Sequence, residues 1–291
     1  MIKNGHQGSI WGQVGKATDA ALASGALVAI RTTAATVADG GVEFVVREVS
    51  SLLEKFDAQA KAAPQRNPFL PYEEALYLGH LSPTHLALLN KFPVMGRHFL
   101  VISESFVHQE TLLLPEDFIA LARALGESDA LAFYNAGRAA GASQRHRHLQ
   151  VVPLPFEGAS HGTPIDPALA AQQGKVGTDI ADLGYRHALG WLQLETSPDS
   201  CGLAMHALYR RLIGLLGITS VATAEGDRQS SAYNLIATRS WMLIVPRTRE
   251  HFASISINAL GFAGSLFVRN DAERELVRRV GPRALLAAVT R

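Results

Sequence analysis

The sequence contains a single cysteine, Cys201. One thiol excludes a disulfide framework and a cysteine-based zinc cluster, and it fits a reducing compartment. The sequence also lacks an excess of charge of either sign, because it has 27 Lys and Arg against 26 Asp and Glu. Proteins that bind nucleic acids or membrane surfaces favour strongly basic patches, so this balance gives no argument for either partner. The sequence contains no run of about 18 apolar residues, so we expect no transmembrane helix. Residues 1–15 are polar, so we expect no secretory signal. We therefore expect a cytoplasmic protein that binds neither nucleic acid nor membranes.

The composition allows a sizeable core, since 47% of the 291 residues are hydrophobic and 18% are charged. Apolar alternation and turn residues predict strands, and periodic apolar positions predict helices. Strands are expected at 42–49, 84–91, 98–103, 130–135, 146–152, 232–238 and 241–246, and helices at 115–125, 177–194, 203–216 and twice near the end of the chain. Hairpins with inserted helices favour an α+β fold with an antiparallel sheet over a doubly wound parallel sheet.

One segment, residues 156–176, is rich in Gly, Ser, Pro and Gln and is the best candidate for a linker. It divides the chain into a predicted N-terminal domain, residues 1–160, and a predicted C-terminal domain, residues 177–291. Both parts contain a hairpin-like pair of strands, but no internal sequence repeat is visible.

The most informative stretch is residues 141–150, which read Gly-Ala-Ser-Gln-Arg-His-Arg-His-Leu-Gln. In an extended strand alternate side chains lie on one face, so His146, His148 and Gln150 should form a polar row. Arg147 and Leu149 should point to the opposite face. A short loop containing glycine leads directly into this row. Backbone N–H groups of such a loop can bind a phosphate.

This row suits covalent chemistry on phosphorus. A neutral imidazole can attack a phosphorus atom, and His148 is the candidate nucleophile because it is the middle member of the row. A backbone carbonyl or His146 could accept a hydrogen bond from one ring nitrogen of His148 and so leave the other nitrogen free to attack. Gln150 can donate its amide to a phosphoryl oxygen. The loop can add backbone N–H donors from Gly141, Ala142, Ser143 and Gln144.

Two other interpretations stay open at this point. Most isolated His-X-His pairs on strands face solvent or bond to neighbours. Two histidines on one face can also bind zinc, with His85, His98 or His108 as a further ligand. Trp241 and Met242 are expected in the core rather than as partners of a base.

The combined motif resembles the diadenosine tetraphosphate phosphorylases, or ATP adenylyltransferases, of the transferase branch of the histidine triad superfamily. The segments that carry the resemblance are Gly-Ala-Ser-Gln and His-X-His-X-Gln. Further similar segments are Asn67–Phe69, Leu89–Val94, His98–Leu100, Tyr233–Leu235, Trp241–Arg247 and Ser256–Gly264. The resemblance covers about residues 40–291. It implies an α+β fold: a histidine-triad-like antiparallel sheet with flanking helices and a second C-terminal α+β part packed on it.

The same resemblance implies phosphorolysis of diadenosine tetraphosphate to ATP and ADP through an adenylyl-His148 intermediate, with His146 and Gln150 as further catalytic residues. The small-molecule partners are then the dinucleotide, phosphate, ATP and ADP. The residues that match substrate-contacting positions are Asn90, Lys91, Asn135, Gly141, Ala142, Ser143, Gln144, Asn234, Asn258, Gly261 and Arg269. Arg145 departs from the family pattern, where Pro or Asp often stands, and adds a cation beside the phosphate path.

Hydrolysis of a dinucleoside polyphosphate, and a sensor that binds the dinucleotide without turnover, are the alternatives to phosphorolysis. Gln150 favours the transferase, because the hydrolase branch usually has a histidine there and a neutral amide does not carry protons. No tightly bound cofactor is expected. Mg²⁺ is a candidate companion of the substrate, whose polyphosphate charge it neutralises.

Overall fold

The computed structural model describes residues 10–49, 67–126, 128–159, 162–193, 197–224 and 226–290. The polar, alanine-rich stretch of the sequence at residues 54–66 lies outside these residues. Within them, none of the helices is long and apolar enough to cross a membrane.

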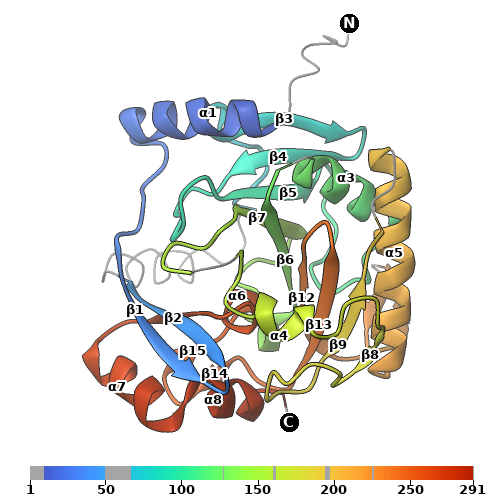
Figure 1. Ribbon diagram of the computed structural model, residues 1–291. Helices are drawn as coiled ribbons and strands as arrows, with labels where there is room; N and C mark the ends of the chain where they lie inside the picture. Colours follow the sequence, from blue (N-terminus) through green and yellow to red (C-terminus); the bar gives the residue numbers. More distant parts are fainter. Residues whose placement is uncertain are drawn as a thin grey trace, which may run out of the picture.

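A nine-stranded sheet forms the centre of the described structure (Figure 1). In spatial order its strands are β3 (Tyr77–Ser82), β4 (His85–Leu89), β5 (Phe99–Ser103), β7 (His148–Pro153), β6 (Ala130–Ala136), β12 (Ala232–Ala237), β13 (Trp241–Arg247), β9 (Ala188–Trp191) and β8 (Gly177–Thr178). Every neighbouring pair is antiparallel. The C-terminal half joins this sheet through the pairing of β12 with β6.

Three short sheets accompany the large one. They are β1 (Thr32–Asp39) with β2 (Val42–Val49) and β16 (Ser265–Val268), β10 (Ser220–Thr223) with β11 (Gly226–Gln229), and β14 (His251–Phe252) with β15 (Ile255–Ser256). The helices are α1 (Ile10–Ser24), α3 (Pro115–Leu125), α4 (Asp166–Ala170), α5 (Pro198–Leu215), α6 (Ala259–Phe262), α7 (Asp271–Val280) and α8 (Pro282–Ala288), with 3-10 turns η1 (Glu74–Leu76) and η2 (Arg138–Ala140).

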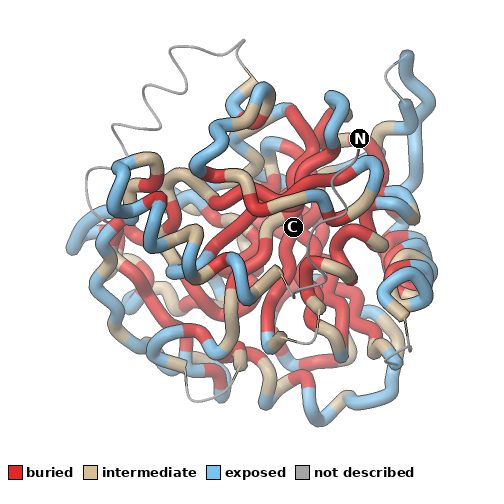
Figure 2. The backbone as a smooth tube through the Cα atoms, turned by 90° about the horizontal axis from the view of Figure 1, so that it is seen from above, coloured by how far each residue is buried: buried red, intermediate tan, exposed pale blue. Residues whose placement is uncertain are grey.

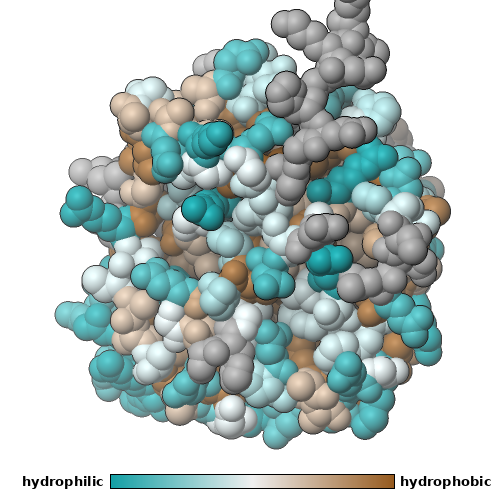
Figure 3. Space-filling view, turned by 45° about the horizontal axis from the view of Figure 1, so that its top comes forward, coloured by the Kyte–Doolittle hydropathy of each residue, from teal (hydrophilic) through white to brown (hydrophobic). Residues whose placement is uncertain are grey.

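The two larger hydrophobic cores lie on opposite faces of the large sheet. One contains residues of α1, α3 and α5, together with Leu149 and Val151 of β7. The other contains residues of β2, β16, α6 and α8, together with Val152 of β7. Neighbouring residues of one strand therefore serve different cores, as the alternation of side chains requires. Figure 2 shows this buried interior (red) enclosed by exposed loops and helices, and Figure 3 shows hydrophilic side chains spread over the outer face with apolar ones mostly recessed.

The α+β fold with an antiparallel sheet is confirmed. Helix α3 begins at Pro115 with two acidic residues in its first turn, as expected, and β12 and β13 form the predicted hairpin. The predicted helix over 177–194 is wrong. This stretch forms β8 and β9, and β9 pairs with β13 through Ala188 to Trp191. Positive φ angles of 50° at Asp179 and 78° at Gly184 break any helix there.

The segment proposed as a linker is part of the packed structure. Phe156, Ile165 and Leu169 are buried in the second core, and α4 lies within the segment. Strands from both predicted domains share one sheet, and the division of the chain into residues 1–160 and 177–291 stays a prediction.

Candidate active site

The predicted row of side chains is present at the start of β7. His148 lies opposite Ile102 of β5, and Gln150 lies between Leu100 of β5 and Phe133 of β6. His146 precedes the strand and forms an isolated bridge with His108. The expected alternation holds, since the intervening side chain of Arg147 enters a different environment.

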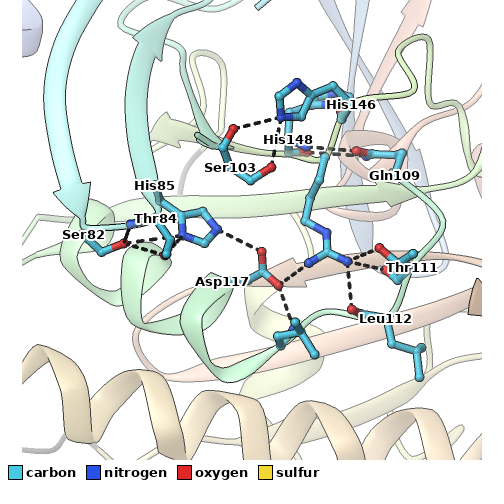
Figure 4. Close-up of polar contacts among 12 residues, drawn as sticks. Ser82, Thr84, His85, Ser103, Gln109, Thr111, Leu112, Asp117, His146 and His148 are labelled. Carbon is cyan, nitrogen blue, oxygen red and sulfur yellow. Dashed lines mark hydrogen bonds and ion pairs between the residues drawn. The ribbon is translucent and has the colours of Figure 1, made fainter. Parts of the chain in front are cut away.

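Arg147 is anchored in a buried polar network, and its partners Asp117 and Leu112 are labelled in Figure 4. Its guanidinium donates to Asp117 Oδ2 at 2.7 Å and to the Leu112 carbonyl at 2.9 Å, and Asp117 Oδ1 lies 3.0 Å from Nε2 of His85. Burial alone would raise the pKa of Asp117, but the hydrogen bond from His85 and the charge of Arg147 lower it overall. The network therefore pairs a buried cation with a buried anion and holds the strand between the two histidines.

Among the described residues, one ring nitrogen of His148 has a hydrogen-bond partner and the other has none. Its Nδ1 lies 2.8 Å from the carbonyl oxygen of His146, which can only accept, so Nδ1 carries the proton. In the described part of the chain, Nε2 has no hydrogen-bond partner. Burial lowers the pKa of His148 to about 4. The ring is therefore neutral at pH 7, with its free electron pair on Nε2.

His146, in contrast, is bonded on both sides of its ring. The Asn67 side chain accepts from Phe69 N–H through Oδ1, so its Nδ2 must be the atom that lies 2.8 Å from Nδ1 of His146. Nε2 then carries the proton and donates to the Ser103 carbonyl at 2.9 Å. Burial lowers the pKa of His146 as well. This histidine is a neutral, fixed support for His148.

The amide of Gln150 is oriented by a second histidine. Asn90 Oδ1 accepts from Phe92 N–H, and Asn90 Nδ2 lies 3.1 Å from Nδ1 of His98. His98 Nε2 therefore carries the proton and donates to Gln150 Oε1 at 3.1 Å. Burial also lowers the pKa of His98 to about 4, so the ring stays neutral. The NH2 group of Gln150 is left to donate outward to a phosphoryl oxygen.

Gln109 takes the place of strand pairing where β6 and β7 separate. The ladder between these strands ends at Phe133 and Gln150. Beyond that point Gln109 Oε1 accepts from the backbone N–H of His148 at 2.9 Å, and its Nε2 donates to the Asn135 carbonyl at 2.9 Å. This buried amide thus holds the nucleophile candidate at a set distance from β6.

The loop before the row supplies fewer free donors than predicted. Gly141 has a φ of 88°, and the N–H groups of Gly141 and Ala142 are used within the turn, by the carbonyls of Arg138 and Gly137. The N–H groups of Ser143 and Gln144 have no partner among the described residues. These two amides are the ones available to a phosphate.

The C-terminal half contributes to the same site. Asn135 Oδ1 accepts from Asn234 Nδ2 at 2.8 Å and from Ala259 N–H at 3.0 Å. Asn234 also donates to the Ala140 carbonyl at 2.9 Å and accepts from the buried guanidinium of Arg247. Asn258 caps α6, and a Cβ at Gly141 would lie 3.2 Å from the Cβ of Asn258. The glycine loop is therefore packed directly against the start of α6.

Three predicted substrate-binding residues have other surroundings. Lys91 pairs with the exposed Glu73. Gly261 is buried in α6, where a Cβ would lie 3.1 Å from a methyl of Ile257. Arg269 follows β16 in the smaller sheet and pairs with the buried Glu273. Asn90 supports His98, as described above. A direct contact of these residues with substrate stays a prediction.

Several functional residues were missed from the sequence. Gln109, Asn67 and His98 hold the row in place, although Asn67 and His98 stand in the segments that carry the family resemblance. Residue type alone gave a weak signal for Asn67, since an Asn side chain commonly forms a turn by accepting from the N–H two residues later. Gln109 gave none. In the described part of the chain, no group of three or more His, Cys, Asp and Glu is arranged to hold a metal ion.

Comparisons with known proteins identify two family models that together cover most of the chain. Residues 3–171 match the Ap4A phosphorylase N-terminal domain, and residues 181–291 match the ATP adenylyltransferase C-terminal domain. Two proteins of Saccharomyces cerevisiae are each 27% identical: Protein APA1 over 253 residues, 78% of this chain and 76% of the relative, and diadenosine 5',5'''-P1,P4-tetraphosphate phosphorylase 2 over 263 residues, 80% and 78%.

The fold is also that of a solved relative. The crystal structure of yeast Ap4A phosphorylase Apa2 aligns over 98% of this chain and 95% of its own, with a TM-score of 0.74 and 22% identity. The same enzyme in complex with Ap4A aligns over 98% of both chains, with a TM-score of 0.73 and 20% identity. Since the N-terminal domain match alone spans more than half of the residues, the chain belongs to the Ap4A phosphorylase family.

Proposed function

We propose that this protein cleaves diadenosine tetraphosphate with inorganic phosphate to ATP and ADP, and that His148 carries the adenylyl group between the two steps. The observation that carries the proposal is the free Nε2 of His148. It is a neutral, desolvated nitrogen whose partner nitrogen is held by the His146 carbonyl. The yeast relatives include a protein named as a phosphorylase of diadenosine tetraphosphate.

In the first step the electron pair on Nε2 forms a bond to the α-phosphorus of one adenylate. The bond from that phosphorus to the bridging oxygen breaks, and ATP leaves with the electron pair as an anion. The imidazole then carries a positive charge, and the His146 carbonyl stabilises it through the Nδ1 proton. No proton needs to move, because Nδ1–H stays where it was.

In the second step a phosphate oxygen attacks the same phosphorus, and the bond to Nε2 breaks. The products are ADP and the original neutral His148. Gln150 donates its NH2 to the phosphoryl oxygens in both steps, with the amide held by His98. The free amides of Ser143 and Gln144 add donors where charge develops.

We also propose that no cofactor is tightly bound, that Mg²⁺ accompanies the polyphosphate of the substrate, and that the protein works in the cytoplasm. The single cysteine supports this location, since it fits a reducing compartment.

The decisive experiment is intact mass spectrometry after brief mixing with diadenosine tetraphosphate in the absence of phosphate. We expect an added AMP mass that is lost, with formation of ADP, when phosphate is added. Release of AMP without phosphate would indicate a hydrolase. Tight binding with no adduct and no product would indicate a sensor and would overturn the proposal.

A further inference from the structure

Phe106 is an aromatic residue left exposed at the edge of the site. It is 53% exposed, and among the large hydrophobic residues exposed in the described structure it is the only aromatic one. Its ring centroid lies 5.5 Å from that of His146. An aromatic side chain kept in solvent beside a catalytic row, rather than buried, suggests a surface for a flat apolar ligand.

Phe106 lies next to the phosphate-binding loop. Arg147 N–H donates to the Val107 carbonyl at 2.8 Å, and Gln109 N–H donates to the Arg145 carbonyl at 2.7 Å. These two bonds tie the segment that contains Phe106 to the end of the loop that carries Ser143 and Gln144. The exposed ring therefore adjoins both His146 of the row and the end of the loop that carries Ser143 and Gln144.

Arg145 adds a cation at the end of the same loop. Arg145 is exposed, and it has no ion pair with a described residue. An uncompensated guanidinium beside free backbone amides favours phosphate oxygens. On the other flank of His148, the Phe69 ring lies 5.1 Å away and belongs to a buried apolar cluster. The two flanks thus differ: one is apolar and buried, and the other is charged and ends at an exposed ring.

We propose that Phe106 stacks on the purine base of the leaving nucleotide and that Arg145 pairs with the phosphates of that nucleotide. The proposal rests on the proposed function, because only a dinucleotide substrate has a second nucleoside beyond the scissile bond. The side chains would then make this site prefer a leaving group that carries a base over one that is polyphosphate alone.

The test compares two substrates that differ only in the second nucleoside: diadenosine tetraphosphate and adenosine 5'-tetraphosphate. Phe106→Ala should lower kcat/KM for the dinucleotide about tenfold, mainly through KM, because stacking of a base on an aromatic ring is lost. It should leave kcat/KM for the mononucleoside tetraphosphate unchanged. Phe106→Trp should restore the preference. Leu114→Ala, at a residue with the same 53% exposure, is the matched control and should change neither value.

Arg145→Gln separates the two contacts, since both substrates carry phosphates and both should lose activity. An equal loss on both substrates in Phe106→Ala, or no loss on either, would overturn the proposal. If the wild type turns over neither substrate, the proposed function fails and binding decides. The Phe106→Trp variant then adds a fluorescent ring at the proposed stacking site. Quenching of this added fluorescence by the dinucleotide, but not by adenosine 5'-tetraphosphate, supports the site. Equal or absent quenching refutes it.

Discussion

His146 and His148 stand two residues apart on one strand, and their hydrogen bonds make them chemically different. His146 has both ring nitrogens occupied, by Asn67 and Ser103. His148 has only Nδ1 occupied, and this nitrogen donates to the backbone carbonyl of His146. Burial lowers the pKa of both rings, so both are neutral. The proposed nucleophile thus differs from its neighbour in the number of ring nitrogens without a partner among the described residues, rather than in charge or residue type.

The supports follow one pattern. Asn67 and Asn90 each accept a hydrogen bond from the N–H two residues later, and each then presents its NH2 to a histidine. Because an amide nitrogen only donates, it forces the facing ring nitrogen to accept and the far one to carry the proton. The same arrangement thus sets the tautomer of His146 and that of His98.

The largest expected effect comes from removing the free nitrogen. His148→Ala should lower kcat for phosphorolysis by a factor on the order of 10⁴ or more, as for loss of a covalent nucleophile, and should abolish the AMP adduct. His80→Ala, at an exposed histidine of β3, is the control and should keep full activity. Retention of the adduct in His148→Ala would show that another atom is the nucleophile.

His146→Ala should have a smaller effect, because the carbonyl that holds His148 remains. We expect a fall in kcat/KM of about tenfold to a hundredfold, typical of lost orienting partners. The half-buried Asn67 amide and the buried Ser103 carbonyl lose their partner, which should cost about 1–3 kcal/mol of unfolding free energy. Mass spectrometry should still detect the adduct. A loss as complete as in His148→Ala would remove the distinction between the two histidines.

Asn90→Ala should act one step further away. Without the Asn90 amide, the proton of His98 can move to Nδ1, and Gln150 loses the donor that orients it. The expected loss in kcat/KM is about threefold to tenfold, near the value of one hydrogen bond. In the Gln150→Ala background, Asn90→Ala should add little. Additive losses would mean that Asn90 acts on substrate directly, as first predicted from the family pattern.

The smallest effect is on the pH dependence of stability. His98 and His148 have pKa values lowered by burial from 6.5 to about 4. Between these values the unfolded chain binds protons that the folded chain does not, so the unfolding free energy falls as the pH falls. Each ring contributes a slope of about 1.4 kcal/mol per pH unit. In urea unfolding between about pH 6 and 5, the dependence of the unfolding free energy on pH should be weaker by one proton in His98→Asn than in the wild type. An unchanged slope would contradict the burial of His98 as a neutral ring.

The local features of the site follow from the sequence, and the distant ones do not. The alternation along 146–150 placed His148 and Gln150 together because a strand repeats every two residues. Gln109 is 39 residues away from His148 in the sequence, and nothing in its neighbourhood marks an amide that replaces strand pairing. The error at 177–194 has a similar origin, because β9 is only four residues long and exists through its pairing with β13.

The bonds among Asn135, Asn234 and Arg247 have a consequence for the history of the chain. The bond from Asn234 to Asn135 crosses the seam between β6 and β12. Asn234 also accepts from the buried guanidinium of Arg247 and donates to the Ala140 carbonyl beside the glycine loop. Recombination could therefore not exchange either half of the chain without disturbing these contacts. A chimaera that joins this N-terminal half to a foreign C-terminal half would need the equivalents of Asn234 and Arg247 to keep the contacts with Asn135 and Ala140.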